Sequence, residues 1–400
     1  MSEWREAKLK DFFKVKHGFA FKGKNITTAE TSDILVTPGN FHIGGGFKSD
    51  KFKYFNAEYP NDYLLQENDI VITMTDLSKE TDTLGYSAKV PKSDNEKKYL
   101  HNQRIGLIQF KNNDANSDYL YWLMRTREYQ GYIIGSASGT SIMHTSPTRI
   151  EEYQFLLPPL PEQKAIAEVL SSLDDKIDLL HRQNKTLEQM AETLFRQWFV
   201  EDAGEDWAEG TIADLIEFNP VRKLARGSVV PYLEMAAIST STFSPNGWYK
   251  REFKSGTKFI NGDTLLARIT PCLENGKTAY VTFLEDGQVA WGSTEYIIMR
   301  PKGDLHPFFA YTLARNSDFR EYAEGCLEGS SGRQRVNVDH LKNYEIKSPS
   351  SEVVTDFNLV AEAVVEKLHQ NSLQIRTLET LRNILLPKLM CGEARIASNG

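Results

Sequence analysis

The chain of 400 residues has few of the side chains from which metal centres and disulfide frameworks are built. Its three cysteines, Cys272, Cys326 and Cys391, have no spacing typical of a metal site. A sparse, odd cysteine count fits a reducing compartment, so we expect a cytoplasmic protein. No apolar run approaches the roughly 20 residues that span a bilayer, and the N-terminal M-S-E-W-R-E-A-K lacks the apolar core of a signal peptide. We expect no membrane association.

The sequence also lacks the common motifs of catalysis. It has no G-x-x-x-x-G-K-[ST] loop, no G-x-G-x-x-G and no H-E-x-x-H. Phe218-Asn219-Pro220-Val221 is a poor match to the Asn/Asp-Pro-Pro-Tyr/Phe motif of amino-methyltransferases. Asp94, Glu96 and Lys98 resemble the ligands of a metal-dependent nuclease, but the run P-K-S-D-N-E-K-K is typical of a solvated loop. We predict a chain with no catalytic residues, no metal and no cofactor of its own.

Length and charge limit the remaining possibilities. A chain of this length is too long for one ordinary core and indicates two or more domains. With 40% hydrophobic and 25% charged residues, it has the composition of a globular protein. A net charge of −7 argues against a protein that coats nucleic acid by charge alone. The same charge is compatible with local basic patches that read a short site.

A long amphipathic helix is predicted near the middle of the chain. It should begin near Pro161, because proline suits the first turn of a helix but not its interior. Apolar residues then alternate at spacings of four and three, as in a helix that packs lengthwise against one partner helix. The seam positions are Ile166, Leu170, Leu173, Ile177, Leu180, Asn184, Leu187, Ala191, Leu194 and Trp198.

The C-terminal stretch provides the partner helix. A shift of 191 residues places Thr186-Leu187-Glu188 on Thr377-Leu378-Glu379. The second seam is then Phe357, Ala361, Val364, Leu368, Asn371, Ile375, Leu378, Arg382, Leu385 and Leu389. In an antiparallel pair the two seam asparagines, Asn184 and Asn371, meet and fix the register, because a slip would leave a buried amide unsatisfied. Two positions fit less well: Arg382 would face Leu173, and Pro387 should end the helix before Leu389.

The rest of the chain contains a repeat. Residues 1–155 and 205–347 are both rich in glycine, serine and aromatic residues, and each precedes one of the long helices. N-D-I-V-I-T-M-T at 68–75 resembles G-D-T-L-L-A-R-I-T at 262–270, and Tyr121-x-Leu123-x-Arg125 reappears as Tyr311-x-Leu313-x-Arg315. We predict an α+β fold of two β-rich mixed domains, each followed by a long helix, with the helices pairing as an antiparallel coiled coil of pseudo-twofold symmetry.

Local patterns predict elements inside both domains. Residues 34–36, 70–72 and 105–108 are predicted strands of the first domain, and 118–129 a helix. Residues 264–266, 279–281 and 296–299 are predicted strands of the second, and 307–324 a helix. The acidic segment 201–206 is the expected linker.

Both β-rich regions interleave cations, amides and aromatic residues. Arg can bind guanine and Asn or Gln adenine with two hydrogen bonds, while Lys holds phosphate. Any one such residue is more often an ordinary surface group, so the DNA-binding interpretation rests on both domains having them. The candidates are Lys22, Lys24, Asn40, His42, Lys51, Lys53, Asn102, Arg104, Lys250, Arg251, Arg268, Asn275, Lys277, Arg333, Gln334 and Arg335.

Four segments give the chain a family resemblance. They are P-L-P-E-Q-K-A-I-A at 159–167, L-F-R-Q-W-F-V at 194–200, G-F-A-F-K at 18–22 and L-R-N-I-L-L-P-K-L-M-C-G-E at 381–393. With these segments and the repeat plan, the whole chain resembles the specificity subunit of a type I restriction–modification enzyme. One departure is S-P-S-S-E-V-V at 348–354, where the second copy lacks the Pro-Glu-Gln start of the first.

The resemblance implies a non-catalytic subunit that reads a bipartite target in double-stranded DNA. It implies target-recognition domains at 1–155 and 201–347, with spacer helices at 156–200 and, with a C-terminal tail, at 348–400. Two methyltransferase subunits per chain would dock around the helix pair, where Pro161, Glu162 and Gln163 are partner-binding candidates, and restriction subunits with a motor would join them. S-adenosylmethionine and ATP with Mg would be held by those partners.

The length of the seam limits the distance between the two reading heads. Residues 166–198 span roughly 50 Å of helix, which separates the heads by at most about 15 base pairs. Two alternatives stay open: a coiled-coil scaffold or adaptor whose β-rich domains bind protein, and a nuclease or methyltransferase with an unrecognised site. Exchange of residues 1–155 for the domain of a related chain would change half of the DNA target only in a specificity subunit.

Overall fold

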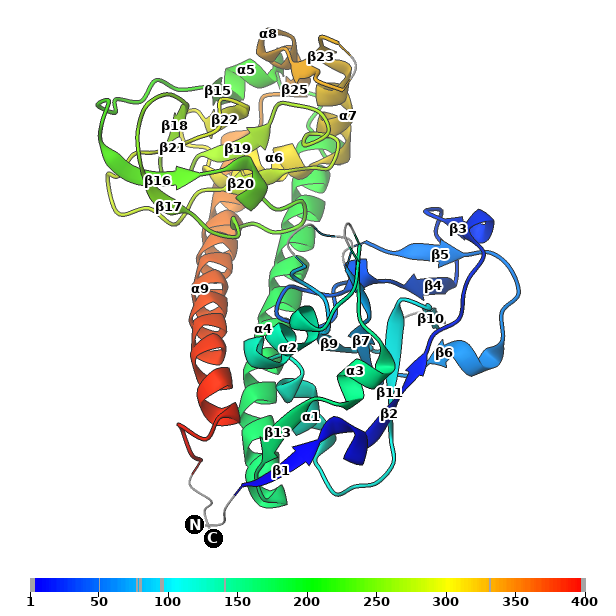
Figure 1. The fold of residues 1–400 in the computed structure, drawn as a ribbon. Helices are drawn as coiled ribbons and strands as arrows, with labels where there is room; N and C mark the ends of the chain where they lie inside the picture. The colour runs from blue at the N-terminus through cyan, green and yellow to red at the C-terminus, as the bar shows by residue number, and fades with distance from the viewer. Residues whose placement is uncertain are drawn as a thin grey trace. The chain divides into compact units, whose positions relative to one another are not determined.

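A computed structural model describes residues 4–49, 51–76, 78, 81–93, 97–139, 142–330 and 332–396. The chain divides into two compact units, unit 1 (residues 1–175 and 378–400) and unit 2 (residues 176–377). Two long helices, α4 (Leu160–Arg196) and α9 (Ser351–Met390), each contribute one part to each unit. Figure 1 shows the β-rich segments and these helices.

Unit 1 contains a five-stranded sheet, a four-stranded sheet and two strand pairs. The five-stranded sheet has the order β3 (Ile26–Thr27), β5 (Lys53–Phe55), β4 (Asp33–Val36), β10 (Lys98–His101) and β6 (Leu64–Leu65). The four-stranded sheet has the order β2 (Phe13–His17), β11 (Ile105–Phe110), β7 (Ile70–Thr73) and β9 (Ser87–Lys89). The pairs are β1 (Arg5–Lys8) with β13 (Gln154–Leu157), and β8 (Thr75–Asp76) with β12 (Met143–His144).

Unit 2 repeats this plan with two four-stranded sheets and two strand pairs. One sheet has the order β15 (Ile216–Phe218), β22 (Tyr296–Pro301), β19 (Thr264–Ala267) and β20 (Thr278–Tyr280). The other has the order β17 (Tyr249–Glu252), β16 (Val229–Leu233), β21 (Ala290–Gly292) and β18 (Thr257–Phe259). The pairs are β14 (Glu209–Thr211) with β25 (Glu345–Lys347), and β23 (Leu327–Glu328) with β24 (Arg335–Val336).

The strand pairings confirm the internal repeat. In unit 1, β4 pairs in parallel with β10 and antiparallel with β5. In unit 2, β16 pairs in parallel with β21 and antiparallel with β17. The echo between residues 68–75 and 262–270 falls on β7 and β19, which take the same third place in their sheets. The predicted α+β class with two β-rich domains and long helices is confirmed, as are the six predicted strands.

The two predicted short helices are each broken into two. Residues 118–129 form α1 (Ser117–Leu123) and the start of α2 (Arg127–Gly135). Residues 307–324 form α6 (Phe308–Arg315) and most of α7 (Ser317–Gly325). Thr126 and Asn316 cause the breaks: each takes an extended conformation and accepts hydrogen bonds from the first turn of the next helix, as an N-cap does. The remaining short helices are α3 (Pro147–Glu151), α5 (Ile212–Leu215) and α8 (Val338–Leu341).

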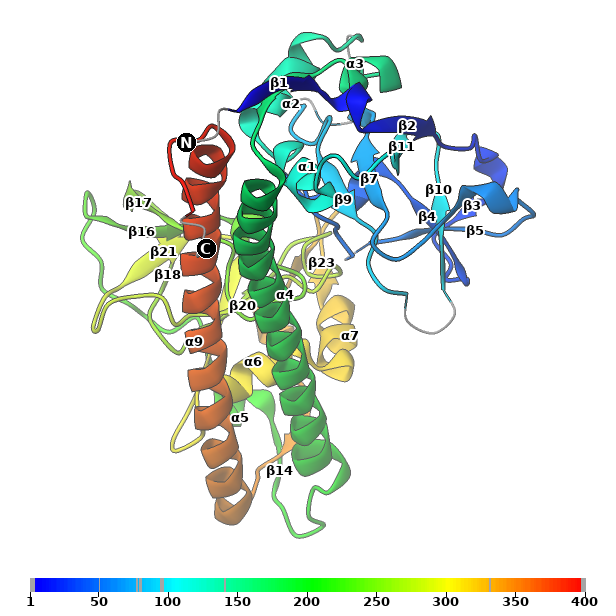
Figure 2. The ribbon, with the colours of Figure 1, turned by 90° about the horizontal axis from the view of Figure 1, so that it is seen from below.

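Helices α4 and α9 lie side by side and run antiparallel (Figures 1 and 2). In unit 1, Ile166 and Leu170 of α4 share a buried core with Leu389 of α9. In unit 2, Phe195 of α4 shares a buried core with Phe357 of α9. The start of α4 therefore packs on the end of α9, and the end of α4 on the start of α9. The antiparallel pairing is confirmed.

All positions of the predicted seam are buried or half-buried, as a helix–helix seam requires, and other positions such as Glu188 and Phe195 are buried as well. Asn371, 1% exposed, donates a hydrogen bond from Nδ2 to Oδ1 of Asn184 at 2.7 Å. The predicted contact between the two asparagines is present, and their role in fixing the register stays a prediction.

The expectation that Pro387 ends the second helix is wrong. Helix α9 continues through Pro387 to Met390. Proline removes one N–H bond, but its carbonyl still accepts from Cys391 N at 3.0 Å. Leu389 and Met390 lie in the core of unit 1, and their burial offsets the lost bond.

Candidate nucleic-acid interface

The first-domain candidates all lie on the five-stranded sheet or its connections. Lys22 and Lys24 precede β3, and Lys53 lies on β5. Asn40, His42 and Lys51 lie between β4 and β5, and Asn102 and Arg104 follow β10. The fold therefore gathers positions that are far apart in the sequence onto one sheet.

Burial divides these candidates into two classes. Exposed residues are Lys22, Lys24, His42, Lys51, Lys53 and Arg104. Asn40 is 1% exposed and Asn102 8% exposed, and the Oδ1 atom of Asn102 accepts from Arg104 N at 2.9 Å. The two asparagines therefore shape the backbone in this structure, while the exposed cations remain candidates for phosphate or base contacts.

The second-domain candidates form two groups. Lys250 and Arg251 are exposed on β17, where the Arg251 guanidinium lies 4.7 Å from the ring of Tyr232. The other group lies on two connections, β19–β20 and β23–β24. These connections are adjacent, because Thr270 N donates to Gln334 O at 3.0 Å. This second group contains Arg268, Asn275, Lys277, Arg333, Gln334 and Arg335.

Several side chains of the second group already have protein partners. Lys277 donates to Met235 O at 2.7 Å, and Arg335 binds both carboxylate oxygens of Glu295. Arg268 donates to Val336 O at 3.2 Å, and Asn275 to Pro271 O at 2.8 Å. Arg333 is exposed. Asp94 and Glu96, the nuclease-like carboxylates, lie outside the described residues.

The connection between β4 and β5 has an internal frame. We name residues 37–49 the first anchored loop. Asn40 Oδ1 accepts from Thr37 N at 2.9 Å, and its Nδ2 donates to the carbonyls of Lys48 and Lys51 at 3.3 and 3.1 Å. One buried amide thus joins the two ends of the loop, so that the exposed His42 and Ile43 lie at its tip.

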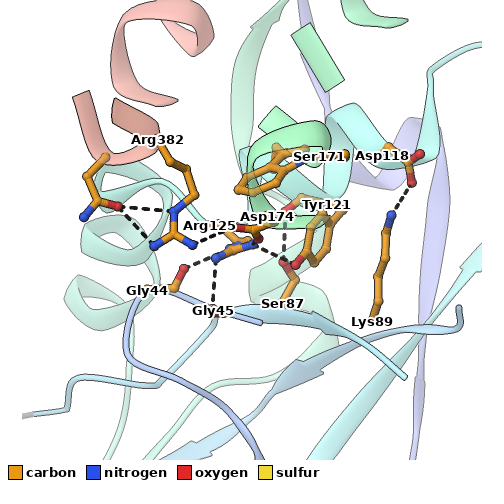
Figure 3. Close-up of polar contacts among 12 residues, drawn as sticks. Gly44, Gly45, Ser87, Lys89, Asp118, Tyr121, Arg125, Ser171, Asp174 and Arg382 are labelled. Atoms are coloured by element: carbon orange, nitrogen blue, oxygen red, sulfur yellow. Dashed lines mark hydrogen bonds and ion pairs between the residues drawn. The ribbon is translucent and has the colours of Figure 1, made fainter. Parts of the chain in front are cut away.

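Arg125 holds the tip of this loop (Figure 3). Its Nε donates to Gly44 O at 3.0 Å and its Nη2 to Gly45 O at 3.3 Å. Gly45 has a φ of +86°, and a Cβ there would lie 2.7 Å from Arg125 Cγ. Glycine is therefore required at this position, both for the backbone conformation and for the close approach of Arg125.

The same guanidinium binds helix α4. Arg125 Nη1 lies 2.5 Å from Asp174 Oδ2, and Arg382 Nη1 of α9 lies 2.5 Å from Asp174 Oδ1. Burial raises the pKa of Asp174, but the charges of Arg125 and Arg382 outweigh burial and hold this pKa below its usual value. Arg382, which fits the apolar seam pattern poorly, is thus one of three residues in a largely buried ion network.

Unit 2 has a corresponding loop between β16 and β17, residues 234–248, which we name the second anchored loop. Arg315 donates from Nη1 to Thr240 O at 2.9 Å and from Nε to Glu192 Oε1 of α4 at 3.2 Å. Ser244 Oγ donates to Ser372 Oγ of α9 at 3.0 Å. A cavity of about 390 Å³ is lined largely by this loop.

A second carboxylate of α4 lies under this loop. Glu188 accepts from Phe243 N at 3.0 Å and from the Tyr311 hydroxyl at 2.6 Å. Burial raises the pKa of Glu188 to about 7, although both hydrogen bonds lower it in part. Sequence reasoning gave no role to Glu188, Asp174, Arg125 or Arg315. The repeated Tyr-x-Leu-x-Arg motif was the signal that pointed to the two arginines.

The partner-binding candidates at the start of α4 differ in exposure. Pro161 is exposed, whereas Gln163 is 1% exposed and accepts from Asn116 N at 2.8 Å. Glu162 accepts from Trp4 Nε1 at 3.1 Å. In this structure Gln163 and Glu162 contact the first domain, and only Pro161 is fully available to another molecule.

Among the described residues, no three His, Cys, Asp or Glu side chains are grouped so that they could hold a metal ion. No helix in the described part of the chain has the length and apolar character needed to cross a membrane.

Comparison with known proteins gives concordant matches. Residues 1–189 match the family model described as "Type I restriction modification DNA specificity domain". The MjaIX type I specificity subunit of Methanocaldococcus jannaschii is 24% identical over 309 residues, covering 70% of this chain and 69% of that protein. The HindI specificity subunit of Haemophilus influenzae is 22% identical over 376 residues, covering 74% and 81%. The crystal structure of a type I S subunit from M. genitalium has the same fold, with a TM-score of 0.56 at 15% identity over 97% of this chain and 96% of that one.

Proposed function

Because this chain is related to the specificity subunits of type I restriction–modification enzymes and carries their DNA specificity domain, we propose that it reads a bipartite target in double-stranded DNA. The duplicated sheet plan carries the proposal: each copy presents exposed cations next to an anchored loop. Specificity subunits are non-catalytic, and the chain recognises DNA sequence for other subunits to act on.

We propose that residues 1–155 read one half of the target and residues 201–347 the other. Exposed Lys22, Lys24, Lys51, Lys53 and Lys250 would hold phosphates. His42, Arg104, Arg251 and Arg333 are the exposed candidates for base contacts. The two seam helices would set the length of the spacer between the halves.

The proposal extends to partners. Two methyltransferase subunits per chain would dock around the helix pair and hold S-adenosylmethionine, and restriction subunits with an ATP- and Mg-dependent motor would join them. The net charge of −7 fits a chain that relies on partners for much of the contact with phosphate. Such a complex would act in the cytoplasm.

Methylome sequencing of cells that express this chain with its methyltransferase partner tests the proposal. We expect methylation at one sequence with two defined halves and a spacer of fixed length. No methylation, with protein ligands captured by the β-rich domains, would favour a scaffold. Methylation or cleavage by the purified chain alone would show an enzyme instead.

A further inference from the structure

The two anchored loops occupy equivalent places in the repeat. Each follows a strand that has one parallel and one antiparallel neighbour, β4 in unit 1 and β16 in unit 2. Each begins with a single 3-10 turn, Pro38–Asn40 or Met235–Ala237. The exposed candidates His42, Lys51 and Lys53 of the first domain, and Lys250 and Arg251 of the second, lie in or directly after these loops.

An arginine of the repeated Tyr-x-Leu-x-Arg motif contacts the backbone of each loop. Arg125 donates to two carbonyls of the first anchored loop, and Arg315 to one carbonyl of the second. Both arginines use a further N–H on a carboxylate of α4, Asp174 or Glu192. The chemistry is the same in the two units: a guanidinium links a loop backbone to a helix carboxylate.

Arginine suits this role because its donors have fixed directions. Arg125 uses Nε, Nη1 and Nη2 on separate acceptors, which a single ammonium cannot reproduce in the same geometry. The guanidinium carbon lies 4.3 Å from the Trp122 ring, and the side chain is 4% exposed. Packing therefore fixes the position of the donors before DNA arrives.

The loop tip depends on these contacts. Gly44, Gly45 and Gly46 have φ values of +86°, +86° and +92°, and glycines have no side chain of their own to anchor the backbone. Gly46 N also donates to Ser87 O at 2.9 Å, and within the tip His42 N donates to Gly46 O and Gly45 N to His42 O, each at 3.0 Å. Without Arg125 the carbonyls of Gly44 and Gly45 would lose their side-chain donor, and the backbone beside His42 and Ile43 would be less restrained.

We infer that Arg125 and Arg315 are equivalent positioning residues for base readout, each holding one anchored loop in its reading conformation against a carboxylate of helix α4. Each arginine thereby controls discrimination at one half of the target without touching DNA. This inference rests on the proposed function, because it assigns each loop to one half of the target.

The test uses the full chain in complex with its methyltransferase partner. Arg125→Gln, Arg315→Gln, Arg125→Lys and a control at an exposed position of α2, Arg127→Gln, are compared with the unsubstituted complex. The target is first defined by the methylome of cells with the unsubstituted chain. Binding is then measured on duplexes with single base changes in either half, and hydrogen exchange reports the amides of residues 42–46.

Arg125→Gln is expected to lower discrimination about tenfold at the half read by the first domain and leave the other half unchanged. Arg315→Gln should do the reverse, Arg125→Lys should lie between, and Arg127→Gln should match the unsubstituted chain. Exchange at residues 42–46 should rise only in the Arg125 variants.

Gly45→Ala provides a second route if Arg125→Gln does not fold. Its Cβ would displace the loop tip from Arg125 while the Arg125–Asp174 pair remains. It should lower discrimination at the same half. If folded Arg125→Gln or Gly45→Ala discriminates normally, or if both halves weaken equally, the inference is wrong. An unsubstituted complex without a bipartite target would instead contradict the proposed function.

Discussion

Two carboxylates of helix α4, Asp174 in unit 1 and Glu188 in unit 2, lie in very different electrostatic surroundings. Asp174 is paired with Arg125 and Arg382, and its pKa lies below the usual value. Glu188 contacts a phenol and a backbone N–H, and burial raises its pKa to about 7. Both copies contact α4 through an arginine–carboxylate pair, but the second copy also uses a buried carboxyl group whose pKa is raised to about 7.

The difference follows from the sequences of the two helices. The shift of 191 residues places Ala191 at the seam position of Arg382, and Val365 at the position of Asp174, which lies beside the seam. The arginine of the repeated motif contacts the loop in both copies. The carboxylate of α4 that binds this arginine lies at a different helix position in each copy. The two copies therefore share geometry but should respond differently to substitution and to pH.

The largest expected effect is that of Asp174→Asn. It leaves the buried Arg125 and the half-buried Arg382 without a counter-charge, so we expect a loss of about 3–5 kcal/mol in the free energy of unfolding of unit 1. Urea unfolding, with hydrogen exchange of α1 and α2, measures this loss. The control Asp175→Asn, at the exposed neighbouring position, should change stability by less than about 0.5 kcal/mol. Equal effects of both substitutions would show that the ion network does not hold the first copy.

The second largest effect is expected for the pH dependence of the stability of unit 2. The pKa of Glu188 is raised to about 7 in the folded chain, so its contribution is fully present below its unfolded pKa and is lost as pH rises to about 7. Glu188→Gln imitates the uncharged carboxyl, and its amide oxygen can still accept from the Tyr311 hydroxyl. We expect it to remove the pH dependence and to stabilise unit 2 at pH 8 by on the order of 2 kcal/mol.

Thermal unfolding of both proteins between pH 5 and pH 8 tests this expectation. Glu168→Gln, at an exposed position of α4, should keep the unsubstituted pH profile. A Glu188→Gln variant that loses stability at pH 8 and keeps its slope would show that Glu188 is charged and well solvated there.

A smaller effect is expected from Arg382→Ala, which gives the first copy the alanine found in the second. Asp174 keeps Arg125, so we expect a loss of about 1–2 kcal/mol. The lowered pKa of Asp174 means that its contribution is present above the usual pKa and is lost as pH falls through the folded value. Removal of Arg382 raises that folded pKa, so the acid transition should begin at higher pH in unfolding scans. If the acid transition does not shift, Arg125 alone lowers the pKa of Asp174.

The smallest effect is expected at the asparagine pair. Asn371→Ala removes one buried hydrogen bond, and the half-buried Asn184 can turn to water, so the loss should be about 1 kcal/mol. Gln374→Ala, on the exposed side of α9, is the matched control. Hydrogen exchange of α9 in unit 2 compares them, and a loss above about 3 kcal/mol would mean that register depends on this pair alone.

The sequence was most informative where one periodicity governed many residues. The seam of α4 and α9 was predicted from its spacing, because apolar residues alternate at intervals of four and three and an antiparallel register brings Asn184 to Asn371. The helix breaks were missed because Thr126 and Asn316 act through local caps, which lie inside otherwise periodic stretches. The Pro387 prediction failed because the burial of Leu389 and Met390 outweighs one lost bond.

The candidate interface was predicted less completely. Residue type identified Asn40 as a base reader, yet tertiary contacts place its amide inside the first anchored loop. Arg335 was named for its charge, yet Glu295, forty positions earlier in the chain, binds its guanidinium. Such partners are distant in sequence and follow no period. The sequence marked Arg125 only as part of the repeated Tyr-x-Leu-x-Arg motif. Its contacts with the first anchored loop and with helix α4 depend on the tertiary fold.

Domain exchange tests the central claim most directly, namely that two copies of one module each read half of a DNA target. Residues 1–155 would be replaced by the corresponding domain of a related specificity subunit, and the methylome of cells with the methyltransferase partner would be sequenced. The account predicts that one half of the methylated sequence changes while the other half and the spacer length stay the same. A methylated sequence that is unchanged, or changed in both halves, would contradict it.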